Sequence, residues 1–321
     1  MSRKSLYPCV LLVFMLVWGV VFGRYYSWTE LTSHWISSLT MVLGSFVAGA
    51  TPLGGGAVAF PVFTKVLGVT TGDAKTFSLM IQSVGMSFAT LFFIARGIAI
   101  NWPLIARLLP LSGLGLLIGL NYDLDGPYLK VLFSILLLLC SLLLVRSQQS
   151  VSNEWPKMTG LAYIIALGGG IISAYLGTGA DTLLFFYLVY CLRMNAKYSI
   201  PTTVCFMACN SMIGSILLFF LHDLEQNQSV ITTWFFAAPV VAIGAPLGGY
   251  IMSKLKDVHV LRFIKFLIVC EVLSTICIVD FLLAGKVLLL LCLVFILLLE
   301  TNLFETLNLK IFSARAKFTQ P

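Results

Sequence analysis

Long apolar runs, separated by short polar breaks, dominate the pattern of hydrophobic and polar positions along this chain. A helix of about 20 apolar residues crosses the hydrocarbon core of a bilayer, so each run is interpreted as a membrane-embedded helix. A β-barrel would show short alternating segments instead. The pattern therefore predicts an all-α polytopic membrane protein with about ten hydrophobic segments, over residues 6–23, 36–67, 76–96, 102–121, 128–146, 159–190, 201–221, 230–252, 261–282 and 286–300.

Two of these runs, 36–67 and 159–190, are too long for one ordinary span and contain glycine clusters near their middle. The clusters are Leu53-Gly54-Gly55-Gly56-Ala57 and Leu176-Gly177-Thr178-Gly179-Ala180. Glycine interrupts helices and frees backbone groups that lipid does not satisfy. Each segment is predicted either to cross the membrane as one broken helix or to return as a re-entrant half-helix. Single crossings would give both halves of the chain the same orientation.

The glycine clusters begin an internal repeat, of the kind from which many transporters are built. Two further motifs recur in the same order: Gln82-Ser83-x3-Ser87 matches Asn210-Ser211-x3-Ser215, and Pro110-x4-Gly115-x3-Gly119 matches Pro239-x4-Gly244-x3-Gly248. We expect two four-helix repeats, each opening with a Gly-broken helix, over residues 36–150 and 151–283. Residues 1–35 would supply a retained additional transmembrane helix and an external loop, and residues 284–321 a C-terminal helix and cytoplasmic tail.

Composition and charge agree with a membrane protein and indicate its topology. Hydrophobic residues make up 59% of the 321 residues and charged residues only 10%, against about a quarter in ordinary soluble domains. The formal charge of +7 comes from single basic residues at the ends of apolar runs, which is a topology signal and not a nucleic-acid patch. The distribution of Lys and Arg favours cytoplasmic termini in a plasma membrane, or in a bacterial inner membrane if the source is prokaryotic.

No motif for a cofactor or metal is found in the sequence. There is no GxxxxGK[ST] string for ATP, and the eight cysteines show no CxxC pair or histidine at metal-ligand spacing. We therefore expect no cofactor, no metal and no nucleic-acid partner, so a transport activity would be coupled to protons or to the gradient of its own substrate.

Matched polar and glycine positions are the candidate binding site for a small anion. Half-helices that start after Gly56 and Gly179 would direct their N-terminal amides toward the midplane, and side-chain amides and hydroxyls would add neutral donors. The alternative roles are close helix packing for the glycines and interhelical hydrogen bonding for the polar side chains. The candidate substrate-binding residues are Gly54, Gly55, Gly56, Gln82, Ser83, Gly177, Thr178, Gly179, Asn210 and Ser211.

Charged residues inside apolar runs are rare and therefore informative. Asp181 follows the second glycine cluster and is consistent with either a proton-coupling group or a helix cap. Arg107 is consistent with either a counter-charge for an anion or a side chain that extends to the interface. Lys65 is expected near a helix end, and the sequence gives no role for Glu271.

The first glycine cluster also carries a family resemblance. The string Gly49-Ala50-Thr51-Pro52-Leu53-Gly54-Gly55-Gly56, followed by Pro61, Gly68 and Ala74-Lys75-Thr76-x-Ser78-Leu79, resembles the TauE/SafE family of sulfite exporters and 4-toluene sulfonate uptake permeases. The resemblance covers about residues 37–283. It departs from the family in the second half, where Gly177-Thr178-Gly179-Ala180-Asp181 replaces a GxGGG string and no proline matches the family's later one. The resemblance implies transport of small sulfur-containing anions such as sulfite or organosulfonates.

These observations favour a secondary transporter that moves a small anion by alternating access at a midplane site between two repeats. An anion channel remains an alternative, because it would share the same halves. An intramembrane enzyme is a weaker alternative, because Asp181, Glu271 and Asp280 form no recognisable catalytic motif, and we do not expect an enzyme. The expected partners are the anionic substrate and the lipid bilayer, and the sequence leaves the oligomeric state open.

Overall fold

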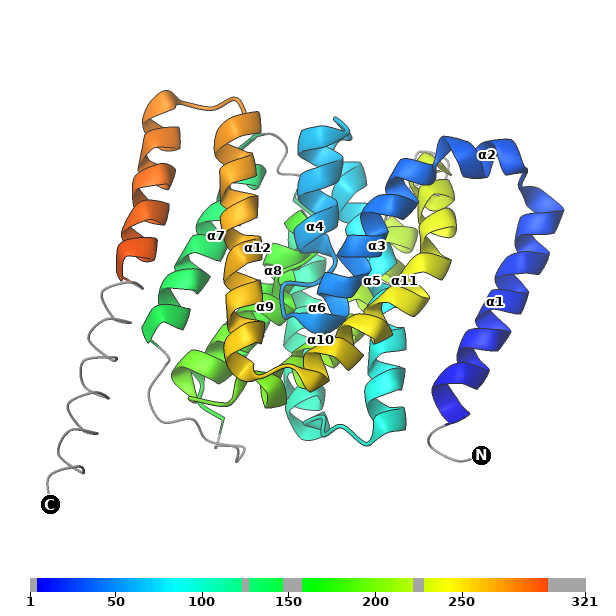
Figure 1. Ribbon diagram of the computed structural model, residues 1–321, viewed down its shortest axis with the longest axis horizontal. Helices are drawn as coiled ribbons and strands as arrows, with labels where there is room; N and C mark the ends of the chain where they lie inside the picture. Colours follow the sequence, from blue (N-terminus) through cyan, green and yellow to red (C-terminus); the bar gives the residue numbers. More distant parts are fainter. Residues whose placement is uncertain (1–4, 123–126, 147–157, 222–227, 300–321) are drawn as a thin grey trace, which may run out of the picture.

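A computed structural model describes residues 5–122, 127–146, 158–221 and 228–299, and helices make up nearly all of this part of the chain (Figure 1). Four shorter segments, α4, η2, α9 and η3, lie next to the two glycine clusters, and η2 and η3 are π-helical. The elements in order are α1 Leu6–Tyr25, α2 Trp28–Ser33, α3 Trp35–Ala50, α4 Gly56–Pro61, η2 Val62–Val66, α5 Thr71–Arg96, α6 Trp102–Leu120, α7 Pro127–Arg146, α8 Leu161–Leu176, α9 Ala180–Phe186, η3 Tyr187–Cys191, α10 Ala196–Leu221, α11 Gln228–Lys254, α12 Asp257–Ile278 and a last helix Leu283–Leu299.

The helices coincide closely with the predicted hydrophobic segments, which confirms an all-α membrane protein. Among the described residues, α1, α5, α6, α10 and α11 are long and apolar enough to cross a membrane by length and composition. The largest differences lie at polar N-termini. Helix α5 begins five residues before the predicted residue 76, because Thr70 caps it by accepting a hydrogen bond from the Asp73 amide.

Both glycine clusters interrupt their helices, as predicted. Helix α3 ends at Ala50 before α4 begins at Gly56, and α8 ends at Leu176 before α9 begins at Ala180. At the interruptions Gly54, Gly177 and Gly179 have φ values of +69°, +70° and +122°. Residues other than glycine rarely adopt such positive φ values, so glycine is required for the change of direction.

The interrupted segments are re-entrant, and the alternative of one broken crossing is wrong. In Figure 1, α3 descends from the side that carries α2, which we call the upper side, and α4 with η2 returns to that side. Helix α8 rises from the opposite, lower side, and α9 with η3 returns there. A hydrogen bond of 3.0 Å from the Asn101 amide to Thr202 Oγ1 likewise joins the beginning of α6 to the beginning of α10 at the lower side.

The two halves consequently run in opposite directions through the bundle. The order α3, α4–η2, α5, α6, α7 begins at the upper side, and the order α8, α9–η3, α10, α11, α12 begins at the lower side. The same orientation for both halves depended on single crossings and is wrong with them, because a re-entrant segment adds no crossing. Opposed halves are the arrangement of inverted-topology transporters.

Each half packs its first helix on the other half. Helix α3 lies along α11, and α8 lies along α6. The repeated glycines allow these approaches, because a methyl group on Gly115 would overlap the carbonyl of Leu167 in α8, and one on Gly248 would overlap the carbonyl of Phe46 in α3. Helices α5 and α10 pack on each other between these pairs. The halves are therefore interlocked and do not form two separate bodies.

Helices α7 and α12 pack together and contact the returning segments, α12 at α4 and η2 and α7 at α9 and η3. Helix α1 lies on α5 and α11, where Trp18 Nε1 donates to the Phe235 carbonyl at 2.9 Å and the Tyr7 hydroxyl donates to the Ala242 carbonyl at 3.3 Å. The predicted external loop within residues 1–35 contains the short helix α2. The predicted cytoplasmic tail after residue 299 lies outside the described residues.

Candidate functional site

The two helix interruptions meet near mid-height in the bundle. The Thr178 hydroxyl donates to the Leu53 carbonyl at 3.2 Å, and the Thr182 hydroxyl donates to the Pro52 carbonyl at 3.0 Å. Both carbonyls belong to the first interruption, and both hydroxyls belong to the second or to the turn after it. We call residues 52–56 and 177–182 together the junction. It joins segments about 125 positions apart in the sequence.

Gln82, near the middle of α5, holds the second interruption in place. Its Nε2 donates to the Gly177 carbonyl at 2.6 Å and to the Ser78 carbonyl of its own helix at 3.0 Å. Gly177 is the C-cap of α8, where carbonyls lose their helical partners, so the amide supplies a donor that lipid does not. Gln82 is 1% exposed, and its hydrogen bonds fix the orientation of the side chain.

Gly54 and Gly56 allow this close approach. A methyl group on Gly54 would lie 2.5 Å from Gln82 Oε1, 2.9 Å from Thr178 Oγ1 and 3.0 Å from Asp181 Oδ2. One on Gly56 would lie 2.7 Å from the Thr178 Cβ. Gly55 faces the other way, toward Gly44 and Ala48 of α3. The glycines of the first cluster therefore serve the junction at two positions and helix packing at the third.

Asp181 lies in the first turn of α9 and is fully buried. Its Oδ1 accepts a hydrogen bond from the Thr182 amide at 2.9 Å, and its Oδ2 has no hydrogen-bond partner among the described residues. The N-cap of α9 is Gly179, which has no side chain for that purpose. Asp181 thus caps the helix with one oxygen and directs the other toward Gly54.

Several predicted site residues lie away from the junction contacts. Asn210 Oδ1 accepts a 2.6 Å hydrogen bond from Ser112, which joins α10 to α6. The Ser211 hydroxyl is buried without a partner among the described residues. Ser83 donates to the Met80 carbonyl of its own helix at 2.7 Å. Arg107 is exposed on α6.

Ser83 instead lines a cavity of about 290 Å³ between α5, α10 and the beginning of α11. Ser215 of α10 faces the same cavity, together with Thr76, Met80 and Trp234. Ser83 and Ser215 belong to the two copies of the repeated Gln/Asn-Ser-x3-Ser motif. The motif therefore places Gln82 at the junction and the hydroxyls of Ser83 and Ser215 in the cavity between α5 and α10.

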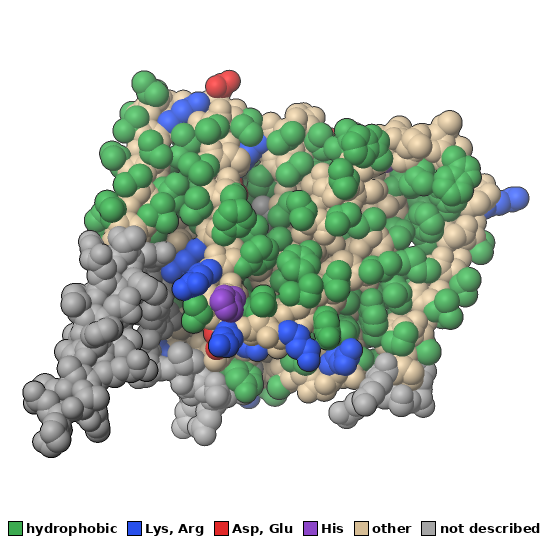
Figure 2. Space-filling view, in the orientation of Figure 1, with side chains coloured by type: hydrophobic (Ala, Val, Ile, Leu, Met, Phe, Trp, Pro, Cys, Tyr) green, Lys and Arg blue, Asp and Glu red, His purple; other side chains and the backbone are tan. Residues whose placement is uncertain are grey.

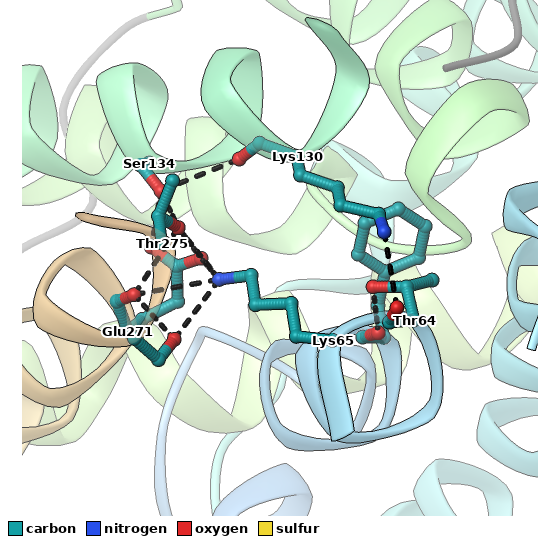
Figure 3. A network of polar contacts seen from close by, with 8 residues as sticks. Thr64, Lys65, Lys130, Ser134, Glu271 and Thr275 are labelled. Carbon is teal, nitrogen blue, oxygen red and sulfur yellow. Dashed lines mark hydrogen bonds and ion pairs between the residues drawn. The ribbon is translucent and has the colours of Figure 1, made fainter. Parts of the chain in front are cut away.

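Glu271, which had no explanation from sequence, forms a buried ion pair with Lys65 (Figure 3). Lys65 Nζ lies 2.6 Å from Glu271 Oε1 and also donates to Thr275 Oγ1 at 2.6 Å and to Ser274 Oγ at 3.0 Å. Ser134 of α7 donates to Glu271 Oε2 at 2.9 Å. The network ties η2 to α12 and α7, so both charges have structural partners.

Sequence reasoning missed Thr182, Ser78 and Ser112, all fully buried polar residues. Thr182 follows Asp181 directly and Ser78 lies one helical turn before Gln82, so spacing around the known motifs was an available signal. The Lys65–Glu271 pair had no local signal, because 206 residues separate the two positions.

The comparison with protein families agrees with these features. The family model described as sulfite exporter TauE/SafE matches residues 37–275, about three quarters of the chain. The chain belongs to the TauE/SafE family. The match includes both interruptions and ends within α12, so it confirms the resemblance drawn from the first glycine cluster. No curated protein matched the chain, and no solved structure did.

TauE/SafE membership together with the apolar helices makes this chain a multi-pass membrane protein of a transporter family. At the junction, buried polar groups of both halves meet where the two helices are interrupted.

Proposed function

We propose that this TauE/SafE protein is a secondary transporter of a small sulfur-containing anion, such as sulfite, a sulfonate or a related organosulfur anion. The direct contact between the two interruptions, through Thr178 and Leu53, carries the proposal. Irregular backbone inside a membrane is tolerated where protein buries it or where it lines a cavity, and discontinuous helices at mid-membrane form binding sites in many transporters. The junction is formed by two discontinuous helices that meet inside the bundle. Catalysis has no comparable support, since the family consists of transporters.

The proposed substrate site comprises the junction and the adjoining polar residues of α5 and α10. Gln82, Thr178 and the glycines at 54 and 56 form its centre. Ser83 and Ser215, in the cavity beside α5 and α10, would line a route toward it. Asn210 and Ser211 would contribute polar groups from α10. Asp181 would bind the coupling ion.

We further propose that transport proceeds by alternating access, with residues 36–150 and 151–283 as inverted repeats. The half-helices α4–η2 and α9–η3 support this, because they lead from the junction to opposite sides (Figure 1). Since α3 packs on α11 and α8 packs on α6, the moving units would combine helices from both repeats. Rocking of one sequence half against the other is incompatible with this interlocked packing.

The proposed location is a plasma membrane, with the lower side facing the cytoplasm. Figure 2 shows basic side chains gathered along the lower edge, and Arg96, Arg193, Lys197, Lys254 and Lys256 lie at helix ends there. An excess of Lys and Arg in short cytoplasmic loops is the strongest topology signal of membrane proteins. Helix α1 begins at this side and the last described helix descends to it.

The test is uptake by the purified protein in proteoliposomes across a panel of sulfur oxyanions, sulfonates and carboxylates. The proposal expects saturable uptake of at least one sulfur-containing anion. Thr178→Leu, which keeps the segment apolar but removes the hydroxyl bound to Leu53, should insert normally and lose this uptake. No movement of any anion in the panel would refute the proposal, and a flux that never saturates would favour a channel.

A further inference from the structure

The junction holds buried oxygen atoms that lack a hydrogen-bond donor. Among the described residues, Gln82 Oε1 and Asp181 Oδ2 are buried without any partner. The two residues are 1% and 0% exposed. Leaving polar atoms unpaired in an apolar interior is costly, and more so for an ionised carboxylate, so native proteins rarely place two such atoms together.

These oxygens converge on one place beside Gly54. The point that a Gly54 methyl group would occupy lies 2.5 Å from Gln82 Oε1, 3.0 Å from Asp181 Oδ2 and 2.9 Å from Thr178 Oγ1. The oxygens come from α5, from the first turn of α9 and from the second interruption. Two segments of the chain, α5 and residues 178–181, therefore present three oxygens to the same small region, and glycine at position 54 leaves space between them.

The surrounding hydrogen bonds turn acceptors toward this region. Both hydrogens of the Gln82 amide have acceptors in the Ser78 and Gly177 carbonyls, so the amide oxygen faces Gly54. The Thr178 hydroxyl donates its hydrogen to the Leu53 carbonyl, so its oxygen lone pairs remain available to a cation. Asp181 forms no ion pair with a described residue. The group is thus rich in acceptors and carries one negative charge.

We propose that these three oxygens bind Na⁺, which compensates the charge of Asp181. Hard cations prefer oxygen ligands, and a divalent cation in a protein site usually recruits more than one carboxylate. One carboxylate with neutral hydroxyl and amide oxygens matches a single positive charge. A proton would bridge one pair of oxygens, whereas Na⁺ accounts for all three oxygens that converge from α5 and residues 178–181.

This inference rests on the proposed function for its consequence. An ionised Asp181 would repel an anion arriving at the junction, because the repulsion between like charges is strong where water is excluded. Bound Na⁺ removes that repulsion, so the anion would bind after or together with the cation. Coupled movement of Na⁺ and the anion in the same direction follows.

The test measures cation binding without any anionic substrate, so it is independent of the transport proposal. The full chain, purified in detergent, is titrated with ²²Na⁺ in choline chloride at constant ionic strength. Saturable binding is expected, and Asp181→Asn should weaken it about tenfold or more, since a hydrogen bond or contact to a charged group exceeds the free energy of one tenfold step. Thr178→Val should weaken it as well, whereas Thr178→Ser, which keeps the hydroxyl, should retain it.

Asp280→Asn is the matched control, because this carboxylate is solvent-exposed near the upper side and should leave binding unchanged. Absence of saturable ²²Na⁺ binding in the wild-type chain, or equal binding in Asp181→Asn, would overturn the proposal. The proposal would also be overturned if low pH stabilised the protein through Asp181 while replacing choline by Na⁺ had no effect on its stability. That result would favour a proton at the site. Sodium binding without anion uptake would leave the sodium site standing and refute the transport function alone.

Discussion

Gln82 in the first half of the chain donates a 2.6 Å hydrogen bond to the carbonyl of Gly177 in the second half. The bond joins α5 to the second interruption, where α8 ends and the chain turns into α9. It satisfies a carbonyl at the C-terminal end of α8 that neither helix nor lipid would satisfy. A single side chain thereby links the packing of α5 to the geometry of the junction.

Gln82→Met should destabilise the protein and lower transport. The substitution keeps the length of the side chain but removes the donor to the Gly177 carbonyl, and an unsatisfied buried acceptor costs about 1–3 kcal/mol. Thermal unfolding of the detergent-solubilised protein measures the loss. Gln228→Met is the control, because Gln228 is exposed at the beginning of α11 and should tolerate the change. Equal stability of the two variants would show that the Gln82 hydrogen bond contributes nothing.

The Lys65–Glu271 pair should behave as one unit. Lys65→Met and Glu271→Gln each leave the other partner buried without its ion pair, which costs roughly 3–5 kcal/mol. The double variant removes both charges and should recover part of the loss in a double-mutant cycle of unfolding. Lys286→Met is the control, since its 3.9 Å pair with the exposed Asp280 lies at the surface, with Lys286 only partly buried. Additive losses in the cycle would contradict a coupled pair.

Gly115 should tolerate no side chain, because the backbone of α8 leaves no space beside it in α6. A methyl group would overlap the Leu167 carbonyl, and forced separation of packed helices costs about 1–3 kcal/mol. Gly113→Ala is the matched control two residues away, where the nearest atom would be a side-chain carbon of Ile213 at 3.8 Å. Thermal unfolding should distinguish Gly115→Ala from Gly113→Ala. Similar unfolding temperatures would place the α6–α8 contact elsewhere.

The re-entrant arrangement makes a direct topological prediction. Cysteines introduced at Thr29, before α3, and at Gly72, after η2, should react with an impermeant thiol reagent from the same side of the membrane. A cysteine at the exposed Lys256, between α11 and α12, should react from the opposite side. The measurement uses a background from which the native cysteines have been removed. Labelling of positions 29 and 72 from opposite sides would show that the segment between them crosses the membrane once, as a broken helix.

The sequence predicted the helices well because membrane thickness imposes a strong and uniform signal on every span. It also located both interruptions, since glycine at positive φ, as at Gly54 and Gly177, has few substitutes. Whether each interrupted segment crosses the membrane or returns to the same side could not be predicted from the local sequence. It depends on what buries the freed backbone, and for Gly177 this is Gln82, 95 residues away.

The candidate site was predicted in part for the same reason. Adjacent residues on a helix diverge by about 100°, so Gln82 and Ser83 lie in different surroundings although one motif contains both. The repeat suggested equal roles for Gln82 and Asn210, but Asn210 binds Ser112 and not an interruption. Such asymmetry arises from packing partners that repeat alignment alone does not specify.

The most direct test of the junction compares uptake of radiolabelled sulfite by Gly54→Ala and Gly68→Ala in proteoliposomes. Both glycines have similar positive φ, +69° and +65°, so both variants carry similar backbone strain, but only Gly54 faces Gln82, Thr178 and Asp181, whereas Gly68 has open space. Sulfite uptake should fall about tenfold or more in Gly54→Ala, the equivalent of ~1.4 kcal/mol, and should stay near wild type in Gly68→Ala. Equal uptake by the two variants, at equal insertion, would contradict a transport site where the two interruptions meet.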